Sequence, residues 1–201
     1  DKNLLLDLDK LETYLKKKTI FKSNKLIVKN TGKIIKAIIP VQTLGQTINF
    51  SKYEKFANKY SLKIIFDSAA CHDPRILRFI KKPTSLFCFS FNGNKTLTTG
   101  AGGMLATNSK LLANKAKLFS TVGKKKSNYD YEVIGYNYKM TNIQASLGLS
   151  QLNNLNKIIK KKKIIFKYYE KKLNKKKNFK IIFDEKYVNW VFALVLNQSK
   201  K

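Results

Sequence analysis

Two short apolar runs, each followed by a polar residue, constrain the fold of this chain most. Leu62-Lys-Ile-Ile-Phe66 leads directly into Asp67, and Ser85-Leu-Phe-Cys-Phe89 leads into Ser90. Runs of this length that alternate with helix-like patterns are typical of strands buried between layers of helices. The first two thirds of the chain show this alternation, so the sequence predicts an α/β fold with a mainly parallel sheet and flanking helices.

The helical segments are recognised by their periodicity and by capping residues. Between residues 50 and 60, Tyr53, Phe56, Ala57 and Tyr60 lie at i, i+3, i+4 and i+7, which predicts a helix with one buried face. The other expected elements are a helix at 8–17, a strand at 34–39 stopped by Pro40, a short strand at 104–107, a helix capped by Ser109 and ending near Phe119, a long helix capped by Thr141 or Asn142 with an apolar face from Leu152 to Leu173, and strands at 179–183 and 188–196.

These elements divide the chain into two parts. Residues 1–145 are expected to form a partial large domain, and residues 146–201 the long helix and the beginning of a small α+β domain. With 201 residues, 43% of them hydrophobic, the chain has enough apolar side chains for a core.

The charge is strongly positive, at a formal +29, with 41 Lys and Arg against 12 Asp and Glu. Such a balance commonly indicates a polyanionic partner. Here almost all of the charge comes from lysine, and Arg75 and Arg78 are the only arginines, whereas recognition of bases and phosphates favours the arginine fork. We therefore expect a solvated lysine surface and no nucleic-acid partner. The alternative is a basic module that binds polyanions through the helix at 157–177.

Cysteine, histidine and targeting patterns point to an ordinary cytoplasmic protein. Cys71 and Cys88 lie in or beside expected strands and are predicted to be reduced thiols. One histidine, His72, and the lack of CxxC and HExxH patterns make a zinc site unexpected. No apolar stretch reaches the ~20 residues needed to span a bilayer, and the start lacks a signal-peptide pattern.

The chemistry centres on Lys95, which lies in a loop of small and amide residues after the second apolar run. A lysine and a carboxylate, each delivered by the carboxyl end of a buried strand, are what a pyridoxal phosphate enzyme needs. The lysine forms a Schiff base with the cofactor aldehyde, and Asp67 would keep the pyridine nitrogen protonated. The simpler alternatives are an exposed Lys95, one lysine among many, and an Asp67 that only caps a turn.

Neighbouring residues fit the same interpretation. The Ser90 hydroxyl and the backbone of 92–94 are suited to a phosphate, and Ser68-Ala-Ala70 leaves room for a flat ring. Gly100-Ala-Gly-Gly103 is interpreted as a bend that allows close backbone approach. His72 is either a catalytic acid or base or, as we favour, a polar surface residue.

Read together, these segments resemble the DegT/DnrJ/EryC1/StrS family of pyridoxal-phosphate-dependent sugar aminotransferases, of fold type I. The matching blocks are Lys36-Ala-Ile-Ile-Pro-Val-Gln-Thr-Leu-Gly-Gln46, Ile65-Phe-Asp-Ser-Ala-Ala70, Phe89-Ser-Phe-Asn-Gly-Asn-Lys95 with Thr98-Thr-Gly-Ala-Gly-Gly103, and Ile134-Gly-Tyr-Asn-Tyr-Lys-Met140 with Asn142-Ile-Gln-Ala. The order of the four blocks makes the resemblance far more specific than any single block.

The resemblance implies a role for each site residue. Lys95 would be bonded to pyridoxal 5'-phosphate, Asp67 would pair with the pyridine nitrogen, and Ala69 would pack on one face of the ring. Ser90 would bind the cofactor phosphate. Asn137 would reach the phosphate held by a neighbouring subunit, which implies a homodimer with a shared active site.

It also implies a reaction, in which an amino donor, expected to be glutamate, supplies nitrogen for a nucleotide-linked keto sugar used in surface polysaccharide or glycan biosynthesis. Two positions depart from the family pattern: Ala70 stands where many members have Gln, His or Glu, and Gln42 replaces the usual histidine. The blocks correspond to the middle of a family member, so we expect the chain to be incomplete at both ends and to have little activity alone.

Overall fold

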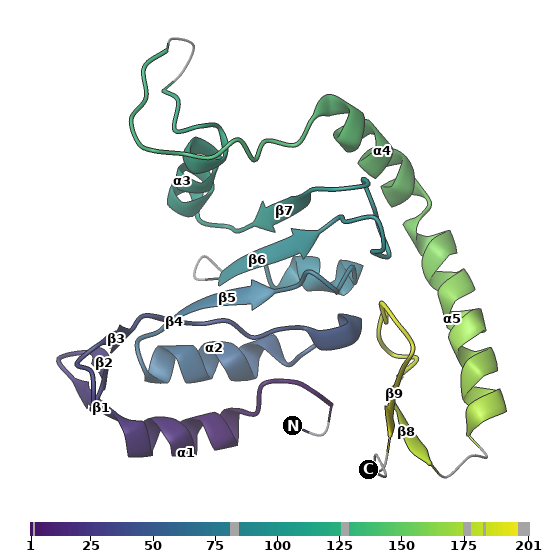
Figure 1. Cartoon of the computed structure of the whole chain (residues 1–201), viewed down its shortest axis with the longest axis horizontal. Coiled ribbons are helices and arrows are strands. Elements are labelled where there is room, and N and C mark those ends of the chain that lie inside the picture. Colours follow the sequence, from purple (N-terminus) through teal and green to yellow (C-terminus); the bar gives the residue numbers. More distant parts are fainter. Residues whose placement is uncertain (2, 81–84, 126–128, 175–177, 183, 197–201) are drawn as a thin grey trace.

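The central element of the fold is a four-stranded sheet with the order β4-β5-β6-β7. The computed structural model describes residues 1, 3–80, 85–125, 129–174, 178–182 and 184–196. The strands of the central sheet are β4 (Ala37–Ile38), β5 (Lys63–Asp67), β6 (Ser85–Ser90) and β7 (Gly103–Ala106). Helices lie around it, as Figure 1 shows, so the predicted α/β class is confirmed.

Strands β4, β5 and β6 run parallel, and β7 runs antiparallel to β6. The sheet is therefore mixed, with three parallel strands and one antiparallel strand. Gly103 explains how β7 approaches β6, because a Cβ atom at this position would lie 2.5 Å from the carbonyl oxygen of Phe89. The bend predicted for the glycine-rich segment does allow this close backbone approach.

The core lies between the sheet and α2 (Phe50–Lys59). Phe50, Phe66 and Phe87 are fully buried, and the Phe50 ring lies 4.9 Å from that of Phe66 and 5.6 Å from that of Phe87, between ring centres. Asn49 begins the helix by accepting a hydrogen bond from the backbone N–H of Lys52. The four aromatic and alanine positions predicted to form its buried face are all buried.

A small antiparallel sheet precedes the central one and was not predicted. It comprises β1 (Thr19–Lys22), β2 (Lys25–Val28) and β3 (Ile34–Ile35), and follows α1 (Leu8–Lys18). The prediction of a single strand at 34–39 is wrong. Ile35 pairs with Leu26 in the small sheet, whereas Ile38 pairs with Ile64 in the central sheet. The chain changes sheets between these residues, and an uninterrupted apolar pattern carries no signal for such a change.

The long helix predicted after residue 140 is two helices, α4 (Asn142–Asn153) and α5 (Leu155–Leu173). Thr141 caps α4 in a reciprocal capping box with Gln144. Of the expected apolar face, Leu155 and Phe166 are buried, whereas Leu152 is 54% exposed. The boundary expected at residue 145 falls inside α4, so the division into two domains stays a prediction. The shorter α3 (Lys110–Ser120) is capped by Ser109, as predicted.

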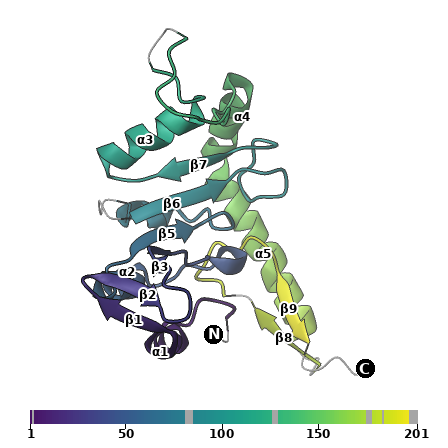
Figure 2. The same cartoon turned by 60° about the vertical axis from the view of Figure 1, so that its left-hand side comes forward.

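Both long helices pass along the edge of the sheet where β5 and β6 end (Figure 1). The final hairpin, β8 (Phe179–Ile182) and β9 (Ala193–Leu196), lies beside α5 in both views (Figures 1 and 2). Of the two strands predicted here, position 183 lies outside the described residues, and 188–192 is not strand. Within the described ranges, no helix is both long and apolar enough to cross a bilayer.

Candidate active site

Asp67 and Ser90 lie at the carboxyl ends of two neighbouring parallel strands. Asp67 is paired in register with Cys88, two residues before Ser90, so these three side chains share one face of the sheet, opposite to the face that packs on Phe50. The electrostatics agree with this placement: the pKa of the Cys88 thiol is raised by burial and by the negative charge of Asp67.

The turn after Asp67 is fixed by that residue itself. Its Oδ1 accepts a hydrogen bond from the backbone N–H of Ala69 at 3.0 Å, while its carbonyl oxygen accepts one from Gln42. The Gln42 side chain is fully buried and accepts a hydrogen bond from the hydroxyl of Ser68. At this departure from the family pattern the glutamine thus supports the turn that carries Asp67 and Ala69.

Both predicted thiols are free in the structure. Cys71 is fully buried, and burial raises the pKa of its thiol to about 12, which makes it an inert core group.

Lys95 lies in a compact loop between β6 and β7. The backbone N–H of Lys95 donates a hydrogen bond to the carbonyl oxygen of Asn92. The backbone N–H of Thr99 donates to the carbonyl oxygen of Phe91, and this bond closes the loop onto the end of β6. The Ser90 hydroxyl accepts a long hydrogen bond, 3.4 Å, from the backbone N–H of Asn92. The structure therefore brings the carboxyl ends of β5 and β6 and the Lys95 loop to the same edge of the sheet.

His72 is buried, so its interpretation as a polar surface residue is wrong. It is 7% exposed, and its Nε2 lies 2.9 Å from the carbonyl oxygen of Ser90. Burial lowers its pKa, and the charges of Lys95 and Lys162 lower it further. A neutral imidazole at the end of β6 follows. The expectation failed because loops are usually solvated, whereas the His72 ring packs near Phe91, with 5.9 Å between ring centres, at the end of β6.

Two residues beside Lys95 were missed from the sequence. Lys95 Nζ lies 3.6 Å from the centre of the Trp190 ring, and Lys162 Nζ donates to the Trp190 carbonyl at 2.7 Å. Lys162 is half-buried, which lowers its pKa. A signal for it exists: it lies three residues after Ile159 and four before Phe166, in the apolar face of α5, where an ordinary surface lysine is not expected.

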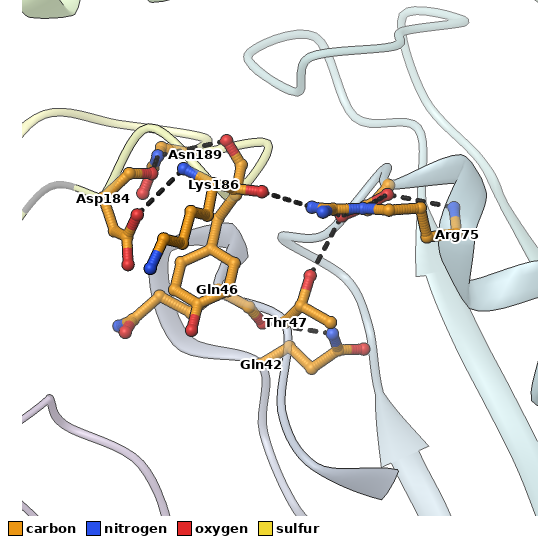
Figure 3. Close-up of polar contacts among 9 residues, drawn as sticks. Gln42, Gln46, Thr47, Arg75, Asp184, Lys186 and Asn189 are labelled. Carbon is orange, nitrogen blue, oxygen red and sulfur yellow. Dashed lines mark hydrogen bonds and ion pairs between the residues drawn. The ribbon is translucent and has the colours of Figure 1, made fainter.

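The loop before β9 is fastened to the core by polar contacts, shown in Figure 3. The Arg75 side chain, from the short helix η2 (Pro74–Arg78), reaches the carbonyl oxygen of Lys186. Arg75 also pairs with the buried carboxylate of Asp73, to which Thr47 donates at 3.0 Å. Asn189 closes the loop by donating to the carbonyl of Asp184. These bonds hold the segment that carries Trp190 against the edge of the sheet.

Asn137 lies apart from this group. It is exposed on the segment between α3 and α4, and in the described part of the chain its backbone forms an isolated bridge with Thr121. Within one chain, Asp67, Ala69, Ser90 and the loop that carries Lys95 thus lie at one edge of the sheet, whereas Asn137 comes from the segment between α3 and α4.

The chemistry of the assembled residues fits pyridoxal phosphate. A carboxylate suits a pyridinium nitrogen, a hydroxyl beside an open turn suits a phosphate, and a primary amine suits an aldehyde. All three are delivered at the carboxyl edge of one α/β sheet, where such folds gather their ligands. Fold and site together define a candidate group-transfer enzyme of the α/β class.

The chain belongs to the DegT/DnrJ/EryC1/StrS aminotransferase family, whose model matches residues 2–201. It is 33% identical over 172 residues to a GDP-perosamine synthase of Caulobacter vibrioides, covering 82% of this chain and 46% of that protein. It is 31% identical to a UDP-4-amino-4,6-dideoxy-N-acetyl-beta-L-altrosamine transaminase of Campylobacter jejuni, covering 78% of this chain and 42% of the relative. The chain thus spans about half the length, or less, of these relatives.

Solved aminotransferase structures superpose on the fold of this chain. PseC of Helicobacter pylori, an aminotransferase involved in the biosynthesis of pseudoaminic acid, superposes with a TM-score of 0.78 at 25% identity, covering 98% of this chain and 51% of PseC. NtdA of Bacillus subtilis, solved with its bound cofactor PMP, superposes with a TM-score of 0.76 at 24% identity, covering 98% and 42%.

Proposed function

We propose that this chain is the cofactor-binding part of a pyridoxal-phosphate-dependent sugar aminotransferase. The reaction moves an amino group from an amino acid, for which glutamate is the proposed donor, to a nucleotide-linked keto sugar for surface polysaccharide or glycan synthesis. The observation that carries the proposal is the convergence of Asp67, Ser90 and the Lys95 loop at one edge of the sheet. The family supports it, since its relatives are named for sugar amination.

Each residue has a distinct task in this proposal. The carboxylate of Asp67 holds a proton on the pyridine nitrogen, and Ala69 offers a small side chain against the ring. The hydroxyl of Ser90 binds phosphate. Lys95 Nζ holds the cofactor and, once released, is the acid and base that moves a proton during transfer. The cofactor supplies the electron sink for the reaction.

Asn137 has a place in the proposal only if two copies meet. Its exposed position suits a contact with phosphate in a neighbouring subunit, and large apolar side chains surround it in sequence: Ile134 is 94% exposed and Tyr138 75%. Apolar groups gathered in this way commonly mark a protein interface. We therefore propose a homodimer with a shared site. We further propose that it acts in the cytoplasm. Sedimentation of the purified chain tests the dimer, and a monomer at tens of micromolar would contradict it.

Borohydride trapping tests the cofactor site. After incubation with pyridoxal phosphate, we expect an absorbance band near the visible edge, and reduction should fix the label on the peptide that carries Lys95. Lys95→Met should abolish the specific label, whereas Lys124→Met, which removes another lysine that lies over an aromatic ring, should not. Label spread evenly over surface lysines would refute the site.

The rival interpretation, a basic polyanion-binding module, predicts the opposite pair of results. It requires tight binding to DNA that weakens steeply with salt, together with no absorbance band. A chain that shows neither property is a silent fragment, and the proposed activity would then belong at most to a longer protein.

A further inference from the structure

The single tryptophan of the chain lies directly against Lys95. Both side chains are half-buried, and the amine nitrogen stands 3.6 Å from the centre of the indole ring. An ammonium group over the face of tryptophan is attracted by the ring electrons at distances up to about 6 Å, and tryptophan is the best of the aromatic residues for this contact. The geometry is therefore that of a close cation–π pair.

Three hydrogen bonds from three parts of the chain hold Trp190 in this position. Its backbone N–H donates to Leu44 at 2.9 Å, its carbonyl oxygen accepts from Lys162 at 2.7 Å, and its Nε1 donates to Asn94 at 2.8 Å. Asn94 is the residue before Lys95, so this hydrogen bond joins the Trp190 ring to the loop that carries Lys95. Lys162 also donates to Oγ1 of Thr96, the residue after Lys95, at 3.2 Å.

We propose that Trp190 is a positioning residue for Lys95, whose amine rests on the indole face whenever it is not bonded to the cofactor. The inference rests on the proposed function, in which this amine leaves the cofactor and returns in every cycle. A free lysine side chain has considerable rotamer freedom, and ordering it costs free energy. A fixed ring beside the loop gives the released amine one ordered resting place out of bulk solvent, and the amine must be freed from that place before it bonds to the cofactor again.

The contact is tested first without cofactor, through the fluorescence of Trp190. Because no other tryptophan contributes, the emission reports on this ring alone. Lys95→Met should change the intensity or the wavelength of the emission, and Lys124→Met, which removes an amine that lies over Tyr129 instead, should leave both unchanged. Identical spectra for the wild-type chain and Lys95→Met would overturn the proposal, whatever the outcome for the cofactor.

The consequence is tested by the rate at which borohydride-trappable cofactor appears on Lys95. In the wild-type chain the amine must leave the ring before it reacts, so Trp190→Leu should raise the rate about two- to thirtyfold, the factor that corresponds to one cation–π contact. Trp190→Tyr retains an aromatic face and should stay near the wild-type rate. An unchanged or slower rate in a folded Trp190→Leu protein would overturn the proposal.

Phe192→Leu is the matched control for loss of an aromatic residue from the same hairpin. Phe192 packs on Phe166 and Tyr169 of α5, whereas the ring that lies against the Lys95 amine is that of Trp190, so replacing Phe192 should leave the rate unchanged. If Phe192→Leu accelerates attachment equally, general loosening of the hairpin is the cause and the positioning role is refuted. If the wild-type chain takes up no cofactor, the proposed function fails, while the fluorescence comparison still decides whether Trp190 holds Lys95.

Discussion

At the scale of single residues, the candidate site is built from groups whose charge is set by their surroundings. His72 is the sole histidine and lies buried between the end of β6 and the lysines at positions 95 and 162. Its Nε2 lies against the carbonyl of Ser90, while its Nδ1 is buried with no hydrogen-bond partner among the described residues. A neutral ring tolerates this environment better than a charged ring, because a charged one would be desolvated beside two cations.

This environment predicts how stability depends on pH. The pKa of His72 in the folded chain lies below its ordinary value of 6.5, so the unfolded chain binds the proton first as pH falls. The free energy of unfolding should therefore decline as pH drops through 6.5, by at most about 1.4 kcal/mol per pH unit, and level off below the folded pKa. Urea unfolding at a series of pH values between 7.5 and 5 measures how the free energy of unfolding changes per pH unit.

His72→Gln is the control, because it removes the titration and should flatten that part of the profile. NMR of the only histidine gives an independent reading. A ring that titrates at or above 6.5 in the folded chain would contradict the buried neutral state.

At the scale of elements, the loop before β9 packs closely against the backbone of one glycine, Gly45. Gly45 ends the short helix η1 (Thr43–Gly45) with a φ of +86°. A Cβ atom there would lie 2.6 Å from the carbonyl oxygen of Val188 and 2.8 Å from the backbone nitrogen of Trp190. Both neighbours are backbone atoms, so neither gives way by a simple rotation of a side chain.

Gly45→Ala should therefore push the Trp190 segment away from the core. Gly32 is a matched control, since its φ is +66° and nothing lies within 4 Å of a Cβ placed there. We expect Gly32→Ala to lower the free energy of unfolding by about 1 kcal/mol, through backbone strain alone. Gly45→Ala should cost about 2 to 4 kcal/mol. Urea denaturation followed by circular dichroism measures both, and equal losses would show that the close approach carries no energetic weight.

The elements also show what could be predicted from the sequence. Helix α2 and strands β5 and β6 were predicted because their periodicity is set by neighbours close in the chain. The change of sheet between Ile35 and Ile38 was not, because both halves read as one apolar run and tertiary pairing decides between them. For the site, Asp67 and Lys95 follow from strand ends, whereas the Trp190 contact depends on how the final hairpin folds back onto the core.

At the scale of the whole molecule, charge is spread over the surface and is poorly compensated. The chain carries a formal +29, and in the described residues the basic partner of each ion pair is exposed, as with Lys167 and Glu185, whose side chains are 58% and 59% accessible. Exposed pairs of this kind contribute little to stability. Repulsion among the lysines is therefore expected to outweigh attraction within the pairs.

This balance predicts that added salt stabilises the chain. Raising sodium chloride from about 10 to about 100 mM shortens the Debye length from about 30 to about 10 Å and screens repulsion between distant lysines more than it weakens close pairs. The urea midpoint at pH 7.5 should rise, with an unchanged slope. The pair of Lys59 with Glu12, at 2.6 Å, is the internal control, because Glu12→Gln should shift all midpoints down and leave the gain from salt intact. A midpoint that falls with salt would show that local ion pairs, rather than net charge, govern the electrostatics of the folded chain.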